Sequence, residues 1–130
     1  MRFTKCLTYG QVTSLFLEGV RIRIMKCKHY LHKDYVGQFH PNFNEIRIYP
    51  WKAHELDTDD GRFVERPQFE DTLIHELVHA KYYNFYYWQD RDLYQDEKLA
   101  EEETERTMKR YPNLYCHILQ TFGLLLDKKE

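Results

Sequence analysis

The 130-residue sequence predicts a single α+β domain, and three patterns lead to this prediction. Residues 21–26 and 44–49 alternate polar and apolar side chains, as half-buried strands do. Residues 74–85 repeat buried-type side chains at three- and four-residue steps, which is the period of an amphipathic helix. The third pattern is the acidic run of residues 101–105, which is expected to lie in a helix that ends near Arg110. The expected order is an N-terminal helix, a three-stranded and mostly antiparallel sheet, a central helix, the acidic helix and a C-terminal helix.

The N-terminal half is expected to supply one helix and all three strands. Residues 11–20 suit a short helix that ends near a glycine, and the strand at 21–26 follows it. Residues 28–36 are the expected partner strand, and residues 37–42 are expected to form a turn. The third strand, residues 44–49, stops at a proline.

The third strand has two interpretations. If it lies at the edge of the sheet beside a cleft, its open backbone can pair with an extended peptide. If it is a plain edge strand instead, the charged side chains of Glu45 and Arg47 discourage pairing with another chain. In either case Ile46 and Ile48 are expected to face the core.

The C-terminal half is expected to be helical after a polar loop at residues 51–67. The central helix is predicted to begin near Gln68 and to run to about Trp88, with a break at residues 89–92. The third helix of this half is predicted to begin at Pro112, a residue favoured in a first helical turn, and to reach Leu125.

The central helix contains the most informative motif, His75-Glu76-Leu77-Val78-His79, an H-E-x-x-H pattern. Two imidazoles four residues apart lie on one face of a helix and can hold one zinc ion. Glu76 lies on the neighbouring edge of that face, where it can accept a proton from a zinc-bound water. The alternative is an ordinary amphipathic helix with two solvated histidines.

The acidic helix is expected to supply a third ligand, because a catalytic zinc usually has three protein ligands and one open position. Glu101 is predicted to be this ligand, since it lies on the rim of the inner helix face and opposite His79 in an antiparallel pair of helices. Glu97 becomes the better candidate if the central helix already ends near Asn84, and Glu105 is the remaining one. The alternative is that these glutamates form a solvated face.

Composition limits the possible partners and the location. A net charge of −2 gives no electrostatic argument for nucleic acid or for an anionic membrane. No apolar run approaches the roughly 20 residues needed to span a bilayer. Three separated cysteines (Cys6, Cys27 and Cys116) and the lack of a recognisable signal peptide indicate a reducing, cytoplasmic location. The oligomeric state is not indicated.

The segment Thr72–Ala80 resembles the zincin metallopeptidases. The strand before it and the acidic helix after it look like the minimal glutamate-zincin plan, and the nearest likenesses are the SprT-like domains and the ImmA/IrrE-like peptidases. The SprT likeness is carried by Thr-Leu-Ile-His-Glu-Leu-Val-His-Ala, although no histidine follows at the expected distance. The ImmA/IrrE likeness is carried by Gly37, Ile46, Ile48 and the Glu-x-x-Ala formed by Glu97 and Ala100.

This resemblance implies a zinc-dependent metallopeptidase that acts on a protein or peptide. His75, His79 and an acidic residue would hold zinc, and Glu76 would be the general base. The alternative is a non-catalytic zincin-fold module, in which zinc is structural or the site binds a protein partner. Glu76 favours the enzyme, because a structural zinc site needs no base beside its ligands.

Overall fold

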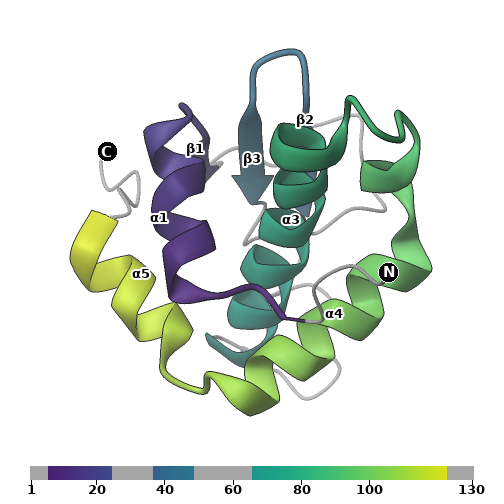
Figure 1. The fold of residues 1–130 in the computed structure, drawn as a ribbon. Helices are drawn as coiled ribbons and strands as arrows, with labels where there is room; N and C mark the ends of the chain where they lie inside the picture. The colour runs from purple at the N-terminus through teal and green to yellow at the C-terminus, as the bar shows by residue number, and fades with distance from the viewer. Residues whose placement is uncertain (1–5, 25–36, 49–65, 123–130) are drawn as a thin grey trace, which may run out of the picture.

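The computed structural model describes residues 6–24, 37–48 and 66–122. These residues form an α+β structure, which confirms the predicted class (Figure 1). In chain order the elements are α1 (Tyr9–Leu17), β1 (Arg21–Ile24), β2 (Gly37–His40), β3 (Glu45–Ile48), α3 (Arg66–Tyr86), the 3-10 helix η2 (Leu93–Gln95), α4 (Glu97–Arg110) and α5 (Leu114–Phe122). Within these ranges, none of the helices combines the length and the apolar character needed to cross a membrane.

The sheet differs from the predicted one in two respects. Its strand order is β1-β3-β2, with β1 parallel to β3 and β2 antiparallel to β3, so the expected mostly antiparallel sheet is wrong and the sheet is mixed. A tight turn at residues 41–44 joins β2 to β3 and makes that pair antiparallel. Because β1 pairs with the other side of β3, β3 is the central strand and not the predicted edge. Among the described strands, β1 and β2 are the edge strands, and β2 is the one that contacts α3.

The segment predicted as a turn at residues 37–42 contains strand β2 instead, and the turn comes after it. Phe39 of β2 is paired with Ile46 of β3. The turn ends at Asn44, whose φ of 51° is a left-handed conformation that asparagine tolerates better than most residues. The side-chain amides of Asn44 and Asn84 hydrogen-bond to each other at 3.2 and 3.0 Å, which ties the turn to α3.

The helix ends lie within a few residues of the predicted ones. Helix α1 begins at Tyr9, because the Thr8 side chain accepts a hydrogen bond from the Gln11 backbone and so caps the first turn. Helix α4 is capped in the same way by a side chain, that of Asp96, which accepts from a backbone N–H three residues later. The predicted strand at 28–36, most of the predicted loop at 51–67 and the expected helix end at Leu125 lie outside the described residues.

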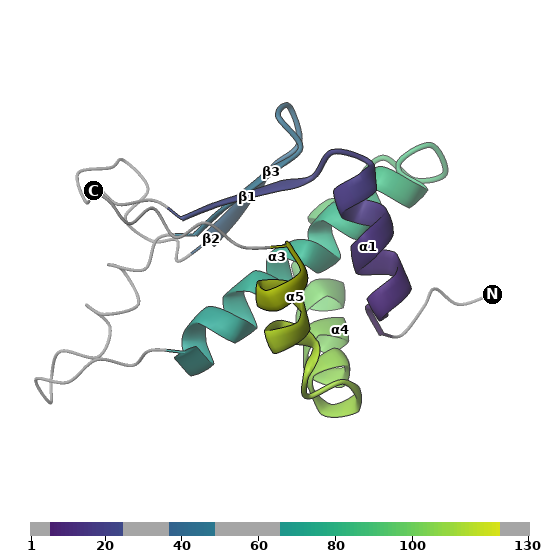
Figure 2. The same ribbon diagram turned by 90° about the vertical axis from the view of Figure 1, so that its left-hand side faces the viewer.

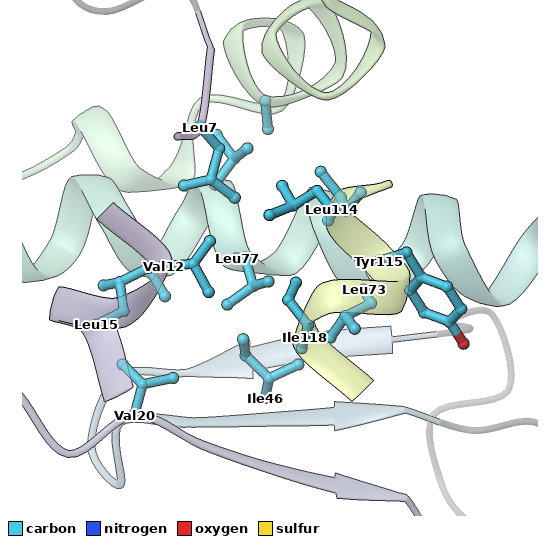
Figure 3. Packing of buried hydrophobic residues seen from close by; sticks show 14 of the residues in the cluster. Leu7, Val12, Leu15, Val20, Ile46, Leu73, Leu77, Leu114, Tyr115 and Ile118 are labelled. Carbon is cyan, nitrogen blue, oxygen red and sulfur yellow. The ribbon is translucent and has the colours of Figure 1, made fainter. Parts of the chain in front are cut away.

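One hydrophobic core holds the helices against a single face of the sheet. Figure 2 shows α1, α3 and α5 below the sheet, with α4 farther from it than α3. In the close view, Ile46 of β3 points toward Leu73 and Leu77 of α3 and toward Ile118 of α5 (Figure 3). All four side chains are at most 3% exposed, and burying one such side chain contributes roughly 1.5–3 kcal/mol. The central helix is therefore fixed on the core along one side.

Helices α3 and α4 are also joined by a buried polar cluster. The Lys81 ammonium donates to one oxygen of the Glu103 carboxylate, and the Tyr82 hydroxyl donates to the other at 2.6 Å. Lys81 and Glu103 are fully buried. Burial lowers the pKa of Lys81, and the hydrogen bond to Glu103 opposes this shift. This cluster fixes the position of α4 relative to α3, within two helical turns of the residues described next.

Candidate metal centre

The H-E-x-x-H segment is helical, as predicted, and its two histidines face the same space. Ile74, Leu77 and Val78 are fully buried, so the apolar stripe of α3 points into the core. His75 and His79 lie one turn apart beside this stripe, with ring centroids separated by 4.8 Å. Their Nε2 atoms are 3.1 Å apart. The packing of α3 therefore places two potential ligand atoms next to each other.

A carboxylate from α4 completes a three-residue group. Glu97 Oε1 is 3.0 Å from His75 Nε2, and Glu97 Oε2 is 3.4 Å from His79 Nε2. The carboxylate is mostly exposed, whereas the His79 ring is buried and the His75 ring is partly buried. The group formed by His75, His79 and Glu97 can hold a metal ion.

The spacing of this group fits zinc. Ligand atoms placed tetrahedrally about 2.0–2.1 Å from an ion lie roughly 3.3 Å from one another. The two imidazole nitrogens are 3.1 Å apart, which is close to this value. With one ligand atom taken from each of the three residues, all the ligand atoms lie within 4.8 Å of one another. Two imidazoles and one carboxylate are also a ligand set found in catalytic zinc sites, which keep a fourth position open. The exposure of Glu97 leaves that side of the group accessible to solvent.

Glu97, and not the predicted first choice Glu101, is the carboxylate that the structure brings to the two histidines. The choice of Glu101 assumed that the central helix runs to about Trp88 and that the chain turns back near residue 90. Helix α3 instead ends at Tyr86, and η2 occupies part of the connection, so α4 begins at Glu97 directly opposite the histidines. Glu101 and Glu105 lie one and two turns farther along α4. Their side chains line cavities beside the histidines but do not belong to the ligand group.

The orientation of His79 is set by a backbone group that sequence patterns did not indicate. Its Nδ1 donates a hydrogen bond to the carbonyl oxygen of Tyr94 in η2. This bond keeps the proton on Nδ1 and leaves the Nε2 lone pair directed at the group. Burial, followed by the neighbouring His75, lowers the pKa of His79, which favours the neutral ring that a metal ligand must have. The carbonyl of Tyr94 thus has the role that a carboxylate or a backbone carbonyl commonly has beside a metal-binding histidine.

Glu76 lies beside the group in a water-poor environment. It is 7% exposed and lines the same cavity as both histidines. Burial, together with the nearby charge of Glu97, raises the pKa of Glu76 to about 8. A carboxyl group with a pKa near neutrality can both take up and release a proton under physiological conditions.

His75, Glu76 and His79 line a cavity of about 620 Å³ between α3, β2 and the start of α4. Gly37 of β2 is part of its lining, and a Cβ at this position would lie 2.6 Å from Cγ2 of Thr72. The absence of a side chain therefore lets β2 approach α3 next to Glu76. The cavity residues contributed by β2 were missed in the sequence, because this segment was interpreted as a turn.

Comparison with known proteins adds no assignment. The chain has no significant match to protein-family models, to curated proteins or to solved structures. The likeness to zincins remains a prediction. The structure itself shows that His75, His79 and Glu97 form a group that can hold a metal ion.

Proposed function

We propose that the protein is a zinc-dependent metallopeptidase. The observation that supports this most strongly is the group of His75, His79 and Glu97, with ligand atoms within 4.8 Å of one another, next to the buried carboxyl of Glu76. A structural zinc site does not need a buried base or an open cavity beside its ligands. Both are features that hydrolysis requires.

Each residue has a separate role in this proposal. His75, His79 and Glu97 bind the ion, and the Tyr94 carbonyl holds the ring of His79 in place. When bound, zinc supplies Lewis-acid activation of water and of the substrate carbonyl. Glu76 accepts a proton from the attacking water and then delivers it to the leaving nitrogen.

The open edge of β2 supports a peptide as the substrate class. An extended chain can add to an exposed sheet edge through main-chain hydrogen bonds. Gly37 and Phe39 of β2 line the cavity with the ligand group, and the edge of β2 is not paired with another strand among the described elements. A chain bound along β2 would pass close to Glu76.

The proposal is tested by measuring metal content and cleavage in one preparation. We expect about one zinc per chain and slow cleavage of an unfolded protein, with activity lost in a chelator and restored by added zinc. His79→Ala should lower both zinc content and cleavage. Stoichiometric zinc without cleavage of any polypeptide would favour the non-catalytic module, and failure to bind zinc would remove the proposal.

A second measurement distinguishes the third ligand. We expect Glu97→Gln to weaken zinc binding by about 100-fold or more, because changes even to groups supporting a metal ligand cost 10–100-fold. Glu101→Gln should have a much smaller effect, since its carboxylate is not in the ligand group. Competition with a chromophoric chelator gives the affinities, and Glu102→Gln, on the exposed side of the same helix, is the matched control. Equal losses for Glu97→Gln and Glu101→Gln would contradict the assignment.

A further inference from the structure

We propose that the cavity selects a peptide with a bulky apolar side chain on one side of the cleaved bond and a basic side chain on the other. This inference rests on the proposed peptidase function and adds its substrate preference. It follows from the different chemistry of the two ends of the cavity, with the ligand group between them.

One end of the cavity is an aromatic wall. The rings of Phe39, Tyr83, Tyr87 and Tyr94 form one connected cluster, with neighbouring centroids 5.0 to 6.2 Å apart. Phe39 and Tyr94 line the cavity together with His79. Tyr83 lies behind them and contacts both rings. Such a surface recovers free energy by covering an apolar or aromatic side chain.

The opposite end is acidic. A second cavity, also of about 620 Å³, continues from the first and shares Asp71, His75 and Glu101 with it. Glu105 joins Asp71 and Glu101 in the lining, and Lys109 is the cation described there. The carboxylates therefore outnumber the cation, and a lysine or arginine side chain of a bound peptide would meet opposite charge.

A buried hydroxyl at the acidic end also indicates a ligand. Thr104 is 3% exposed and lines this second cavity, yet its Oγ1 has no hydrogen-bond partner among the described residues. An unpaired buried hydroxyl costs roughly 1–3 kcal/mol. An arginine or lysine head group that enters beside Glu101 and Glu105 would bring N–H donors to this oxygen once the Thr104 side chain turns toward the cavity that it lines.

The positions along α3 fix the length of the segment. The lining of the first cavity runs along α3 from Asp71 at the acidic end to His79 beside the aromatic wall, which is about 12 Å along the helix axis at about 1.5 Å per residue. An extended peptide advances about 3.3 Å per residue, so the two ends are about three to four peptide residues apart. The ligand group lies between them, which places the apolar and basic side chains on opposite sides of the bond that is attacked.

The test measures binding to zinc-loaded Glu76→Gln protein, which should hold a peptide without cleaving it. The probes are fluorescent hexapeptides of alanine with phenylalanine and arginine on opposite sides of the centre, prepared in both chain orders. In one order, we expect binding at least about tenfold tighter than that of the peptides with Phe replaced by Ala or with Arg replaced by Glu. The arginine preference should weaken at high salt.

Protein variants assign each preference to one end of the cavity. Phe39→Ala should remove the discrimination between phenylalanine and alanine, and Phe43→Ala, a 65% exposed phenylalanine on the nearby turn, should leave it unchanged. Glu101→Gln with Glu105→Gln should remove the preference for arginine, with Glu102→Gln as the control.

Equal binding of all the peptides, or binding of none, overturns the inference even if the wild-type enzyme cleaves protein. Selective binding without cleavage by the zinc-loaded wild type would instead refute the peptidase assignment and keep the preference. Since the peptides themselves are varied, the result does not depend on the folding of any cavity variant.

Discussion

Glu76→Gln is expected to reduce peptide hydrolysis by about 10²- to 10⁴-fold while the protein still binds zinc. The amide has the shape of the carboxyl group but cannot accept the proton of the attacking water, and positioned general bases contribute rate factors of this size. Glu76 is next to a ligand in sequence but is not part of the ligand group. The measurement is kcat for a fluorogenic peptide, together with the zinc content of the same sample.

Glu76→Asp gives a matched comparison, because it keeps the carboxyl and moves it by one methylene. We expect this variant to retain more activity than Glu76→Gln, since the chemistry is present at a displaced position. The Glu102→Gln variant of the exposed side of α4 should keep wild-type kcat. Unchanged hydrolysis by Glu76→Gln would show that another group accepts the proton, and loss of zinc from this variant would show that Glu76 supports the metal instead.

The histidine pair was predictable from the sequence because its geometry is local. Four residues make slightly more than one turn of a helix, so any helix through this segment places His75 and His79 side by side. The periodicity of Ile74, Leu77 and Val78 also predicted which side of the helix would face the core, and all three are buried. The identity of the third ligand depends on how the chain turns between two helices, which no periodic pattern specifies.

The carboxylate and the sheet order show what local patterns leave open. Glu97 and Glu101 are one helical turn apart, so helix periodicity places both near the side of α4 that faces α3. The three residues of η2 set where α4 begins, and this determines that Glu97 lies opposite the histidines. Similarly, the alternation in β3 predicts a strand but not its neighbours. Strand order follows from the packing of the whole sheet on α3, and Gly37, whose lack of a side chain permits this packing, is one residue in a segment with weak alternation.

The burial of Glu103 was also not predicted, although the sequence contains two features that indicate it: a lysine within the apolar stripe of α3 and a recognisable inner face on α4. Lys81 falls within the apolar stripe of α3, and Ala100, Thr104 and Thr107 mark the inner face of α4. Among consecutive glutamates, the one that turns inward is the one next to this inner face. A charged residue in a buried stripe predicts an opposite charge on the element that packs against it, because an unpaired buried charge is too costly.

Glu103→Gln is expected to destabilise the protein by about 3–5 kcal/mol, the cost of leaving one partner of a buried ion pair alone. Lys81 would lose its counter-charge, and the Tyr82 hydroxyl would lose its acceptor carboxylate. Domains of this size are usually stable by only about 5–15 kcal/mol, so this change alone would remove a large part of the free energy of unfolding. Urea denaturation of the chelator-treated protein measures it, with the slope m compared between variants.

Two further variants separate the buried charge from simple loss of a side chain. Glu102→Gln, one residue away and exposed, should change the free energy of unfolding by no more than about 0.5 kcal/mol. The double variant Lys81→Met with Glu103→Leu removes both charges and should recover most of the stability lost in Glu103→Gln, since apolar replacements of a buried pair are often neutral or stabilising. If the double variant is as unstable as Glu103→Gln, the loss comes from altered packing between α3 and α4 and not from an uncompensated charge. A wild-type midpoint for Glu103→Gln would mean that Lys81 is neutral or solvated in the folded protein.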